Sequence, residues 1–302
     1  MRRAIVIGAG FGGLALAIRL QSAGVQTMIV EARDKPGGRA YHWHRDGHVF
    51  DAGPTVITDP DCLRRLWRLS GDDMTRDVTL VPVKPFYARD WPDGTRFDYS
   101  NDDAALFAQI EALNPADVEG YKRFLRYSAG VYEEGYVKLG TTAFESLTDM
   151  LKAAPALARY QAWRSVYSIV SKFVADEHLR QALSFHTLLV GGNKAPVDWA
   201  VEGDRYASII LDTLAERLIP DIRSRIRTRF HYSPSDFQSD LFAHLGSAFS
   251  LEPVLRQSAW LRPHNRDDKI RNLYFVGAGT HPGAGIPGVV GSAEATARLM
   301  LA

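Results

Sequence analysis

The sequence has almost no cysteine and no long apolar run, and these two absences limit the kind of protein it encodes. Cys62 is the single cysteine among 302 residues, so no disulfide can form within the chain, as is typical of proteins from reducing compartments. No uncharged stretch of about eighteen apolar residues occurs, so no membrane-spanning helix is expected. An apolar strand-like run begins already at Ala4, so no signal peptide is expected. We therefore expect a cytoplasmic protein.

The sequence also lacks an excess of charge and the spacings of several common active sites. A formal net charge of +1 gives no broad basic surface for nucleic acid. The histidines and the cysteine do not have the spacing of metal ligands, and no GxSxG motif is present. We therefore expect no nucleic-acid partner, no bound metal and no serine nucleophile.

Glycine, by contrast, is concentrated near the two ends of the chain. In RAIVIGAGFGG an apolar run is followed by Gly8, Gly10 and Gly13 in the GxGxxG spacing. Gly8 permits a tight turn, Gly10 lets the backbone approach a pyrophosphate, and Gly13 lets a helix pack closely on a strand. A helical pattern ended by Gly24 leads to a second apolar run that closes on Glu31, whose carboxylate would accept ribose hydroxyls. This series predicts a dinucleotide-binding unit with the phosphates at a helix N-terminus.

A second cluster of glycines and cations distinguishes FAD from NAD as the dinucleotide. The stretch EARDKPGGRAY contains Lys35, Gly38 and Arg39, and it continues to FDAGPTVI with Gly53 and Pro54. This run resembles the FAD-binding extension shared by amine oxidases and carotenoid desaturases. The resemblance implies FAD, with these five residues as part of its site.

A third glycine-rich stretch lies near the C-terminus, in VGAGTHPGAGIPGVVGSA. It resembles the C-terminal FAD signature of the bacterial-type phytoene desaturases, whose order is matched by Gly277, Gly279, Thr280, His281, Pro282, Gly283, Gly285, Pro287 and Gly288. The resemblance covers most of the chain. It implies that a strand at 273–276 returns beside the N-terminal unit and that Gly277, Gly279, Pro287 and Gly288 wrap the flavin. A helix from about residue 289 would point its positive N-terminus at the anionic reduced ring.

The same resemblance implies an activity, which is the FAD-dependent desaturation of phytoene toward lycopene in carotenoid biosynthesis. The substrate would be a carotenoid hydrocarbon, and the electrons would pass to oxygen or a quinone. Asp149 and His281 are the candidate catalytic residues. Asp149 and Glu177 are candidate polar residues near a tunnel, and His186 and His281 are candidates to face the substrate or the flavin. Two alternatives stay open: a related flavoenzyme such as a carotenoid isomerase, an apocarotenoid desaturase or an amine oxidase, or an inactive truncated protein that binds a membrane or a partner.

The stretch 150–175 contains no acidic residue and mixes cations with large apolar residues. Its cations are Lys152, Arg159, Arg164 and Lys172. This composition indicates a helix lying on an anionic membrane surface, which would make the protein peripherally membrane-associated. The alternative is a core helix with a solvated basic edge. Pro155 is expected to break the stretch into two helices.

We predict an α/β fold with a Rossmann-like FAD-binding domain built from both chain ends. The expected division is 1–100 for the N-terminal part of this domain, 101–193 for a mainly helical substrate- and membrane-facing region, and 194–302 for the return to the FAD domain. After Asn193 a segment on the order of 100 to 200 residues, which the resemblance leads one to expect, is absent. Its absence is expected to expose apolar surface on the sheet, to weaken FAD binding and to leave little activity.

Overall fold

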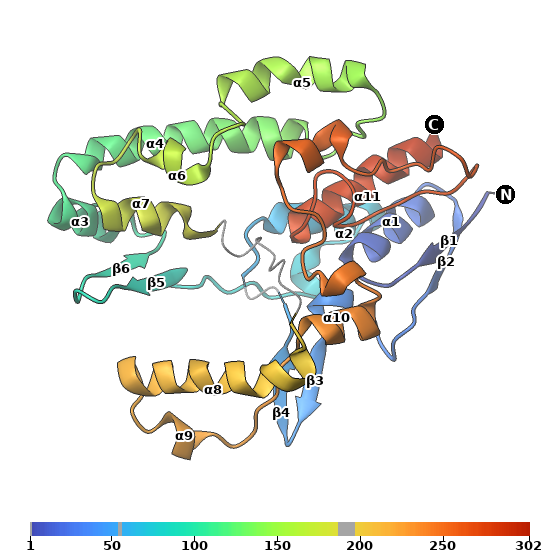
Figure 1. The fold of residues 1–302 in the computed structure, drawn as a ribbon. Helices are drawn as coiled ribbons and strands as arrows, with labels where there is room; N and C mark the ends of the chain where they lie inside the picture. The colour runs from blue at the N-terminus through green and yellow to red at the C-terminus, as the bar shows by residue number, and fades with distance from the viewer. Residues whose placement is uncertain (1, 54–55, 187–196) are drawn as a thin grey trace.

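The computed structural model describes residues 2–53, 56–186 and 197–302 (Figure 1). It begins with β1 (Arg3–Ile7), α1 (Phe11–Ser22) and β2 (Gln26–Val30). The two strands are parallel and in register, with Ile5 opposite Met28 and Ile7 opposite Val30. Gly24 follows the end of α1 with φ of +79°, a conformation that favours glycine. The strand, helix, strand unit predicted from the GxGxxG series is therefore confirmed.

The rest of the N-terminal part consists of short elements that flank this unit. They are the 3₁₀ turn η1 (Gly38–Ala40), the hairpin β3 (His42–Arg45) and β4 (His48–Asp51), α2 (Pro60–Ser70), η2 (Met74–Arg76), and the hairpin β5 (Tyr87–Asp90) and β6 (Arg96–Tyr99). Asp59 caps α2 by accepting from the Asp61 and Cys62 N–H groups. Each sheet in the described part of the chain has two strands.

The middle of the chain is helical, as predicted. It contains α3 (Asp103–Leu113), α4 (Asp117–Tyr132), the π-helical turn η3 (Glu133–Lys138), α5 (Leu147–Arg159), α6 (Val166–Val170) and α7 (Glu177–Ser184). The predicted break at Pro155 is wrong, because α5 continues through this residue. A proline removes one helical N–H, and its usual acceptor belongs to Leu151, which is 62% exposed, so water can satisfy that carbonyl.

The C-terminal part returns to the first unit and ends in a long helix. Its elements are α8 (Trp199–Arg217), α9 (Ile222–Arg225), α10 (Pro234–Leu241), the short turns η5 (His244–Gly246), η6 (Leu255–Gln257) and η7 (Ala259–Leu261), and α11 (Ile286–Leu301). The strand predicted at 273–276 is wrong, since Tyr274 makes only a single antiparallel bridge with Arg266. A strand needs a ladder of hydrogen bonds to a neighbour, and this one bridge does not make a ladder.

The main hydrophobic core lies between β1, α1, α2 and α11, which joins the two ends of the chain. Leu20 of α1 and Ala293 of α11 are fully buried in it. An ion pair of 2.6 Å between Arg19 and Glu294 ties the two helices together. The α/β unit built from both chain ends is therefore confirmed.

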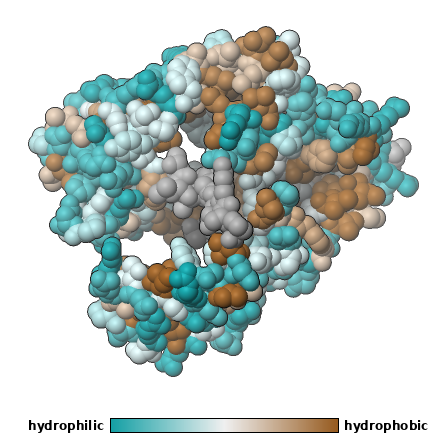
Figure 2. Space-filling model, in the orientation of Figure 1, coloured by the Kyte–Doolittle hydropathy of each residue, from teal (hydrophilic) through white to brown (hydrophobic). Residues whose placement is uncertain are grey.

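The opposite face of the β1–β2 sheet is not covered. Four aliphatic side chains point there, and their exposed fractions are 70% for Ile5, 86% for Ile7, 63% for Met28 and 49% for Val30. By contrast, Val6 points toward the helices and is 5% exposed. Figure 2 shows hydrophobic surface at the right of the molecule, where β1 and β2 lie in Figure 1. The exposed apolar sheet predicted from the missing segment is confirmed.

Candidate flavin site between the chain ends

The turn between β1 and α1 has the shape that the glycine spacing predicts. Gly8 has φ of +100°, and its N–H donates to the Val30 carbonyl at 2.7 Å. A Cβ at Gly13 would lie 2.0 Å from the Gly8 carbonyl oxygen, so this position admits only glycine. Gly10 is the N-cap of α1 and no side chain caps the helix, which leaves its N-terminus available to a phosphate group.

The second glycine cluster packs directly on this turn. Gly37 forms a parallel bridge with Gly10, and its N–H donates to the Ala9 carbonyl at 3.0 Å. A Cβ at Gly38 would lie 3.1 Å from the Gly10 Cα. Gly53 approaches the same cluster, since a Cβ added at this residue would lie 2.4 Å from the Arg39 carbonyl oxygen. The structure thus brings Gly10, Gly38 and Gly53 together, whereas Pro54 lies outside the described residues.

Glu31 lies at the end of β2 beside the first glycine turn. Its carboxylate accepts the Ala9 N–H at 2.5 Å and the Arg33 N–H at 3.1 Å. The hydrogen bond from Ala9 lowers the pKa of Glu31, so the carboxylate is ionised at neutral pH. The predicted contact of Glu31 with a ribose stays a prediction.

The cations of the second cluster contact aromatic and backbone groups around Tyr41. The Lys35 ammonium lies 4.4 Å from the centre of the Tyr41 ring, and the Arg33 guanidinium lies 3.5 Å from it. Arg39 donates to the Ser247 carbonyl at 3.1 Å, which connects this cluster to the C-terminal part. A small pocket beside it is lined by Gly38, Arg39, Tyr41 and Tyr232, among others.

The C-terminal glycine loop lies against the start of α1. A Cβ at Gly12 would lie 3.2 Å from the Gly277 Cα, so the two loops meet backbone to backbone. Gly277 has φ of +108°, and a Cβ at Gly288 would lie 2.6 Å from the Gly283 carbonyl oxygen. Gly279 has more room, with the Ser250 hydroxyl 3.7 Å from its added Cβ. Three segments from opposite ends of the chain therefore form one backbone-lined site.

The last helix starts three residues earlier than the predicted residue 289, at Ile286. Pro287 lies in its first turn, where the missing N–H of proline costs no helical hydrogen bond. No side chain caps this end and its first turn contains no acidic residue. The N-terminus of α11 therefore keeps its partial positive charge beside the glycine loop.

A buried polar network holds this loop on α11, and sequence patterns did not reveal it. Ser292 accepts the Gly277 N–H at 3.0 Å and lies 2.6 Å from the Thr280 hydroxyl. Asn265 donates to Thr296 at 2.9 Å. These four side chains are at most 2% exposed. The four-residue spacing from Ser292 to Thr296 was the available signal, because it places two hydroxyls on one face of a helix.

Arg262 gives the loop an unbalanced buried charge. It is 3% exposed, and its guanidinium donates to the Ala278 carbonyl at 2.7 Å and to those of Gln257 and Leu251. Among the described residues no carboxylate forms an ion pair with it, and its Nε has no hydrogen-bond partner. A buried cation without a counter-ion suits an anionic ligand. The glycine cradle and this charge fit a dinucleotide with a flavin ring.

His281 stands in the glycine loop and connects it to the helical middle. Its Nε2 donates to the Leu139 carbonyl at 2.9 Å, because a carbonyl oxygen can only accept. The ring lies edge-on to Phe144 with 4.7 Å between ring centres. Burial lowers the pKa of His281 to about 4, so the imidazole is neutral at pH 7 with Nδ1 unprotonated. Its catalytic role stays a prediction.

Asp149 and His186 lie in positions with clear structural partners. Asp149 forms a capping box at the start of α5, where its carboxylate accepts the Ser146 N–H at 3.1 Å and the Ser146 hydroxyl at 2.7 Å. The hydroxyl lowers the pKa of Asp149, which is therefore ionised at neutral pH. His186 packs edge-on to Tyr87 with 5.0 Å between ring centres, and burial lowers its pKa. The predicted place of Asp149 near a tunnel and that of His186 beside the substrate or the flavin stay predictions.

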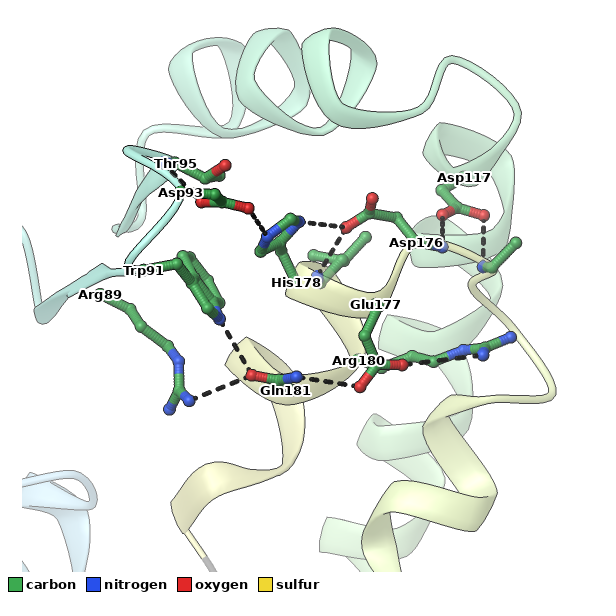
Figure 3. Close-up of polar contacts among 12 residues, drawn as sticks. Arg89, Trp91, Asp93, Thr95, Asp117, Asp176, Glu177, His178, Arg180 and Gln181 are labelled. Atoms are coloured by element: carbon green, nitrogen blue, oxygen red, sulfur yellow. Dashed lines mark hydrogen bonds and ion pairs between the residues drawn. The ribbon is translucent and has the colours of Figure 1, made fainter.

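Glu177 belongs to a polar network on α7 (Figure 3). Its carboxylate accepts from the Gln181 amide at 2.9 Å and from the Tyr167 hydroxyl at 2.7 Å. On the same helix His178 lies 2.8 Å from Asp93, at the tip of the β5–β6 hairpin. These contacts hold α7 on the hairpin and on α6, and Glu177 contributes to that packing.

Comparison with known proteins identifies the family to which these loops belong. The model of the flavin-containing amine oxidoreductases matches residues 11–200 and 199–301. The chain therefore belongs to this family of flavin-dependent oxidoreductases.

Within the family, the chain is similar to curated bacterial phytoene desaturases. It is 41% identical to the lycopene-forming phytoene desaturase of a Paracoccus species, over 99% of this chain and 97% of the relative. It is 38% identical to that of Pseudescherichia vulneris, over 100% of this chain and 99% of the relative. A solved putrescine oxidase has a TM-score of 0.37 and 22% identity over 60% of this chain and 35% of its own, which is too weak to support a conclusion.

These alignments confirm the predicted internal gap. The alignment with the Paracoccus desaturase spans 487 positions, whereas this chain has 302 residues, so at least 185 positions have no residue here. The family model divides at residues 199–200, at the start of α8. The gap therefore lies close to the position that the sequence predicts.

Proposed function

We propose that this chain binds FAD and takes part in the desaturation of phytoene toward lycopene, with a carotenoid hydrocarbon as the substrate. The observation that carries the proposal is the 41% identity over 99% of the chain to a lycopene-forming phytoene desaturase. The backbone contact between Gly12 and Gly277 supports it, because both ends of the chain contribute to one cradle. A cradle of bare backbone suits a large planar cofactor with a pyrophosphate.

Each end of the chain would bind a different part of FAD. Gly8, Gly10 and the N-terminus of α1 would bind the pyrophosphate, and Glu31 would bind the ribose. Lys35, Gly38, Arg39, Gly53 and Pro54 would complete this half of the site. Gly277, Gly279, Pro287 and Gly288 would lie along the flavin, with Arg262 and the N-terminus of α11 supplying positive charge. Bound FAD supplies the acceptor for a hydride from an allylic carbon.

The protein's own part in the reaction would be to hold the polyene, exclude water and receive a proton. His281 is the proposed proton acceptor in the loop, since its Nδ1 carries a lone pair while Nε2 is held by Leu139. Asp149 is the second proposed catalytic residue and is ionised at neutral pH. The low pKa of His281 makes it a weak base, which suffices for a proton next to a delocalised cation.

A peripheral membrane position is part of the proposal, because the substrate is a hydrocarbon. Leu147, Leu151 and Trp163 are 54%, 62% and 60% exposed, next to the cations of the stretch 150–175. α5 lies at the edge of the molecule in Figure 1, above α4. No helix in the described part of the chain is long and apolar enough to cross a bilayer. Apolar and basic side chains on α5 and in the residues that follow it suit an anionic lipid surface.

Further details of the proposal rest on the resemblance to the desaturases. The electron acceptor would be oxygen or a quinone. The division into 1–100, 101–193 and 194–302 would separate the FAD-binding ends from a substrate-facing middle. The competing proposals are a related flavoenzyme and an inactive truncated form. The flavin content of the purified chain distinguishes these two, because the flavoenzyme contains bound flavin.

The cofactor assignment is tested by replacing Gly10 with valine. An added Cβ at Gly10 meets nothing closer than the Gly38 Cα at 3.8 Å, so the fold should survive while flavin binding is lost. Gly135→Val is the matched control, because nothing lies within 4 Å of its added Cβ and it is outside the glycine cradle. Stoichiometric FAD in the Gly10→Val protein, measured by flavin absorbance, would refute the assignment.

The membrane proposal is tested with vesicles of defined charge. Replacing Lys152, Arg159, Arg164 and Lys172 by glutamine removes about 1 kcal/mol of attraction per cation. Sedimentation with anionic vesicles should therefore fall, and binding by the wild-type chain should weaken as salt rises. Equal binding to neutral vesicles at high salt would contradict the electrostatic part of this proposal.

A further inference from the structure

Two surfaces of this chain carry exposed apolar side chains that no other described part of the chain covers. The first is the open face of the β1–β2 sheet, with Ile5, Ile7, Met28 and Val30. The second is α8, where Gly203 is the one residue described as buried along the whole helix. We call these surfaces the open sheet face and the α8 surface.

The register of the strands shows that the open sheet face is built to be covered. Ile5 lies opposite Met28, and Ile7 lies opposite Val30, so the four aliphatic side chains form one block. Parallel sheets are almost always buried on both faces, because their connections place helices on each side. A block of aliphatic side chains on one sheet face is the pattern of a packed layer that is absent from this chain.

The α8 surface shows the same lack of cover. Val201, Tyr206 and Ile210 are 68%, 56% and 47% exposed. α8 extends away from α1, α2 and α11 in Figure 1, and its main contacts are with α9 and α10. It also begins at residue 199, where the family model divides, so it is the first helix after the gap.

The alignments indicate what should cover these surfaces. The relatives match this chain on both sides of the gap and carry at least 185 further positions within it. This is the size of a whole domain. A second copy of this chain has the same gap, so it brings the same two strands and no new layer.

We propose that the open sheet face and the α8 surface dock a separate polypeptide that is the counterpart of the missing segment. This partner presents an apolar layer to Ile5, Ile7, Met28 and Val30 and a strand edge to the free edge of the sheet. Added strands are a common mode of protein association, because backbone hydrogen bonds give affinity and alternate side chains give specificity. The chain is then one part of a two-chain protein.

The test uses the reactivity of an introduced cysteine. Cys62 is 1% exposed and burial raises its pKa to about 11, so the wild-type chain gives a low background with a maleimide. Ile7→Cys places a thiol on the open sheet face, and Leu245→Cys places a matched control at a residue that is 81% exposed. Each variant is purified alone and after co-expression with the corresponding segment of the Paracoccus desaturase.

We expect the segment to co-purify and to slow labelling at position 7 by about tenfold or more, with position 245 unchanged. Met28→Lys should abolish co-purification, whereas Leu245→Lys should not. A soluble segment that does not co-purify overturns the proposal. The proposal is also overturned if the chain dimerises by itself and the dimer slows labelling at position 7, because a second copy then covers the open sheet face.

An insoluble segment is handled by placing it within the chain. The same segment is inserted between Asn193 and Lys194, and labelling at position 7 is measured in the folded product. Protection at position 7 supports the proposal, and labelling at the rate of the short chain overturns it. No step depends on FAD, so a failure here is distinct from a failure of the proposed function.

Discussion

Helices α11 and α8 have similar lengths, 16 and 19 residues, and opposite environments. α11 buries eight of its residues, including Ala293 and Thr296, against α1 and the glycine loop. α8 buries only Gly203. The difference shows that the two ends of the chain pack into a shared core, whereas the helix that follows the gap has no layer packed against most of its surface.

The cause of this difference is the identity of the residues that meet. Small residues let α11 approach other backbone, since a Cβ at Gly291 would lie 2.5 Å from the Gly140 carbonyl oxygen. Arg298 reaches the Thr141 carbonyl from the same helix. α8 has larger aliphatic side chains, among them Ile209 and Ile210, that need a facing layer. Burial of such side chains is what stabilises a helix in a protein.

The largest expected effect is on catalysis. The 302-residue chain should convert little phytoene in liposomes with added FAD, because one side of the molecule lacks its layer. Inserting the Paracoccus segment after Asn193 should restore the formation of lycopene, followed by chromatography. Robust lycopene formation by the short chain would show that the uncovered part is not needed.

The next largest effect is a difference in the free energy of unfolding between substitutions in the α1–α11 core and on α8. Leu20→Ala removes a fully buried side chain from the α1–α11 core and should lower the free energy of unfolding by about 3 kcal/mol. Ile210→Ala, at a residue that is 47% exposed, should change it by less than about 0.5 kcal/mol. Urea denaturation of the two variants measures both values. Equal losses would remove the distinction between the two regions.

A pH dependence is expected from His281, at the contact between the glycine loop and the helical middle. Its folded pKa of about 4 lies below the unfolded value of about 6.5, so the unfolded state binds more protons between these values. The contribution of this group is complete above about pH 6.5 and is lost as pH falls toward 4. We expect a loss of about 3 kcal/mol over this window.

His281→Gln is the variant that isolates this contribution. Glutamine keeps an N–H donor for the Leu139 carbonyl but does not titrate. The difference in unfolding free energy between pH 7 and pH 4 should therefore become smaller in this variant. An unchanged pH profile would assign the dependence to another group.

The smallest expected effect concerns the buried network on α11. Ser292→Ala removes the acceptor of the Gly277 N–H and should lower the unfolding free energy by about 1 kcal/mol. The loop should also become less ordered, so FAD affinity of the chain should fall. Ser239→Ala, on the exposed part of α10, is the control. Unchanged flavin affinity in Ser292→Ala would show that the network does not shape the site.

The sequence determined the parts of this protein that depend on local backbone geometry. Gly8 and Gly13 predicted the first turn and the packing of α1, because a tight turn and a close approach each exclude a side chain. The stretch 150–175, which contains no acidic residue, predicted helices. The resemblance to the desaturases predicted that the two ends of the chain meet. The position of the gap was also predicted from the point where the resemblance breaks.

Only the tertiary structure decided which surfaces are covered and which polar groups are buried. Residues 273–276 form an apolar run that looks like a strand, but a strand also needs a ladder of hydrogen bonds to a neighbour. In the described part of the chain this run makes a single bridge, between Tyr274 and Arg266. Asn265 and Ser292 lie 27 residues apart, so no local pattern could predict their common network. Arg262 and the open sheet face depend in the same way on distant segments, because burial is a property of the packed chain.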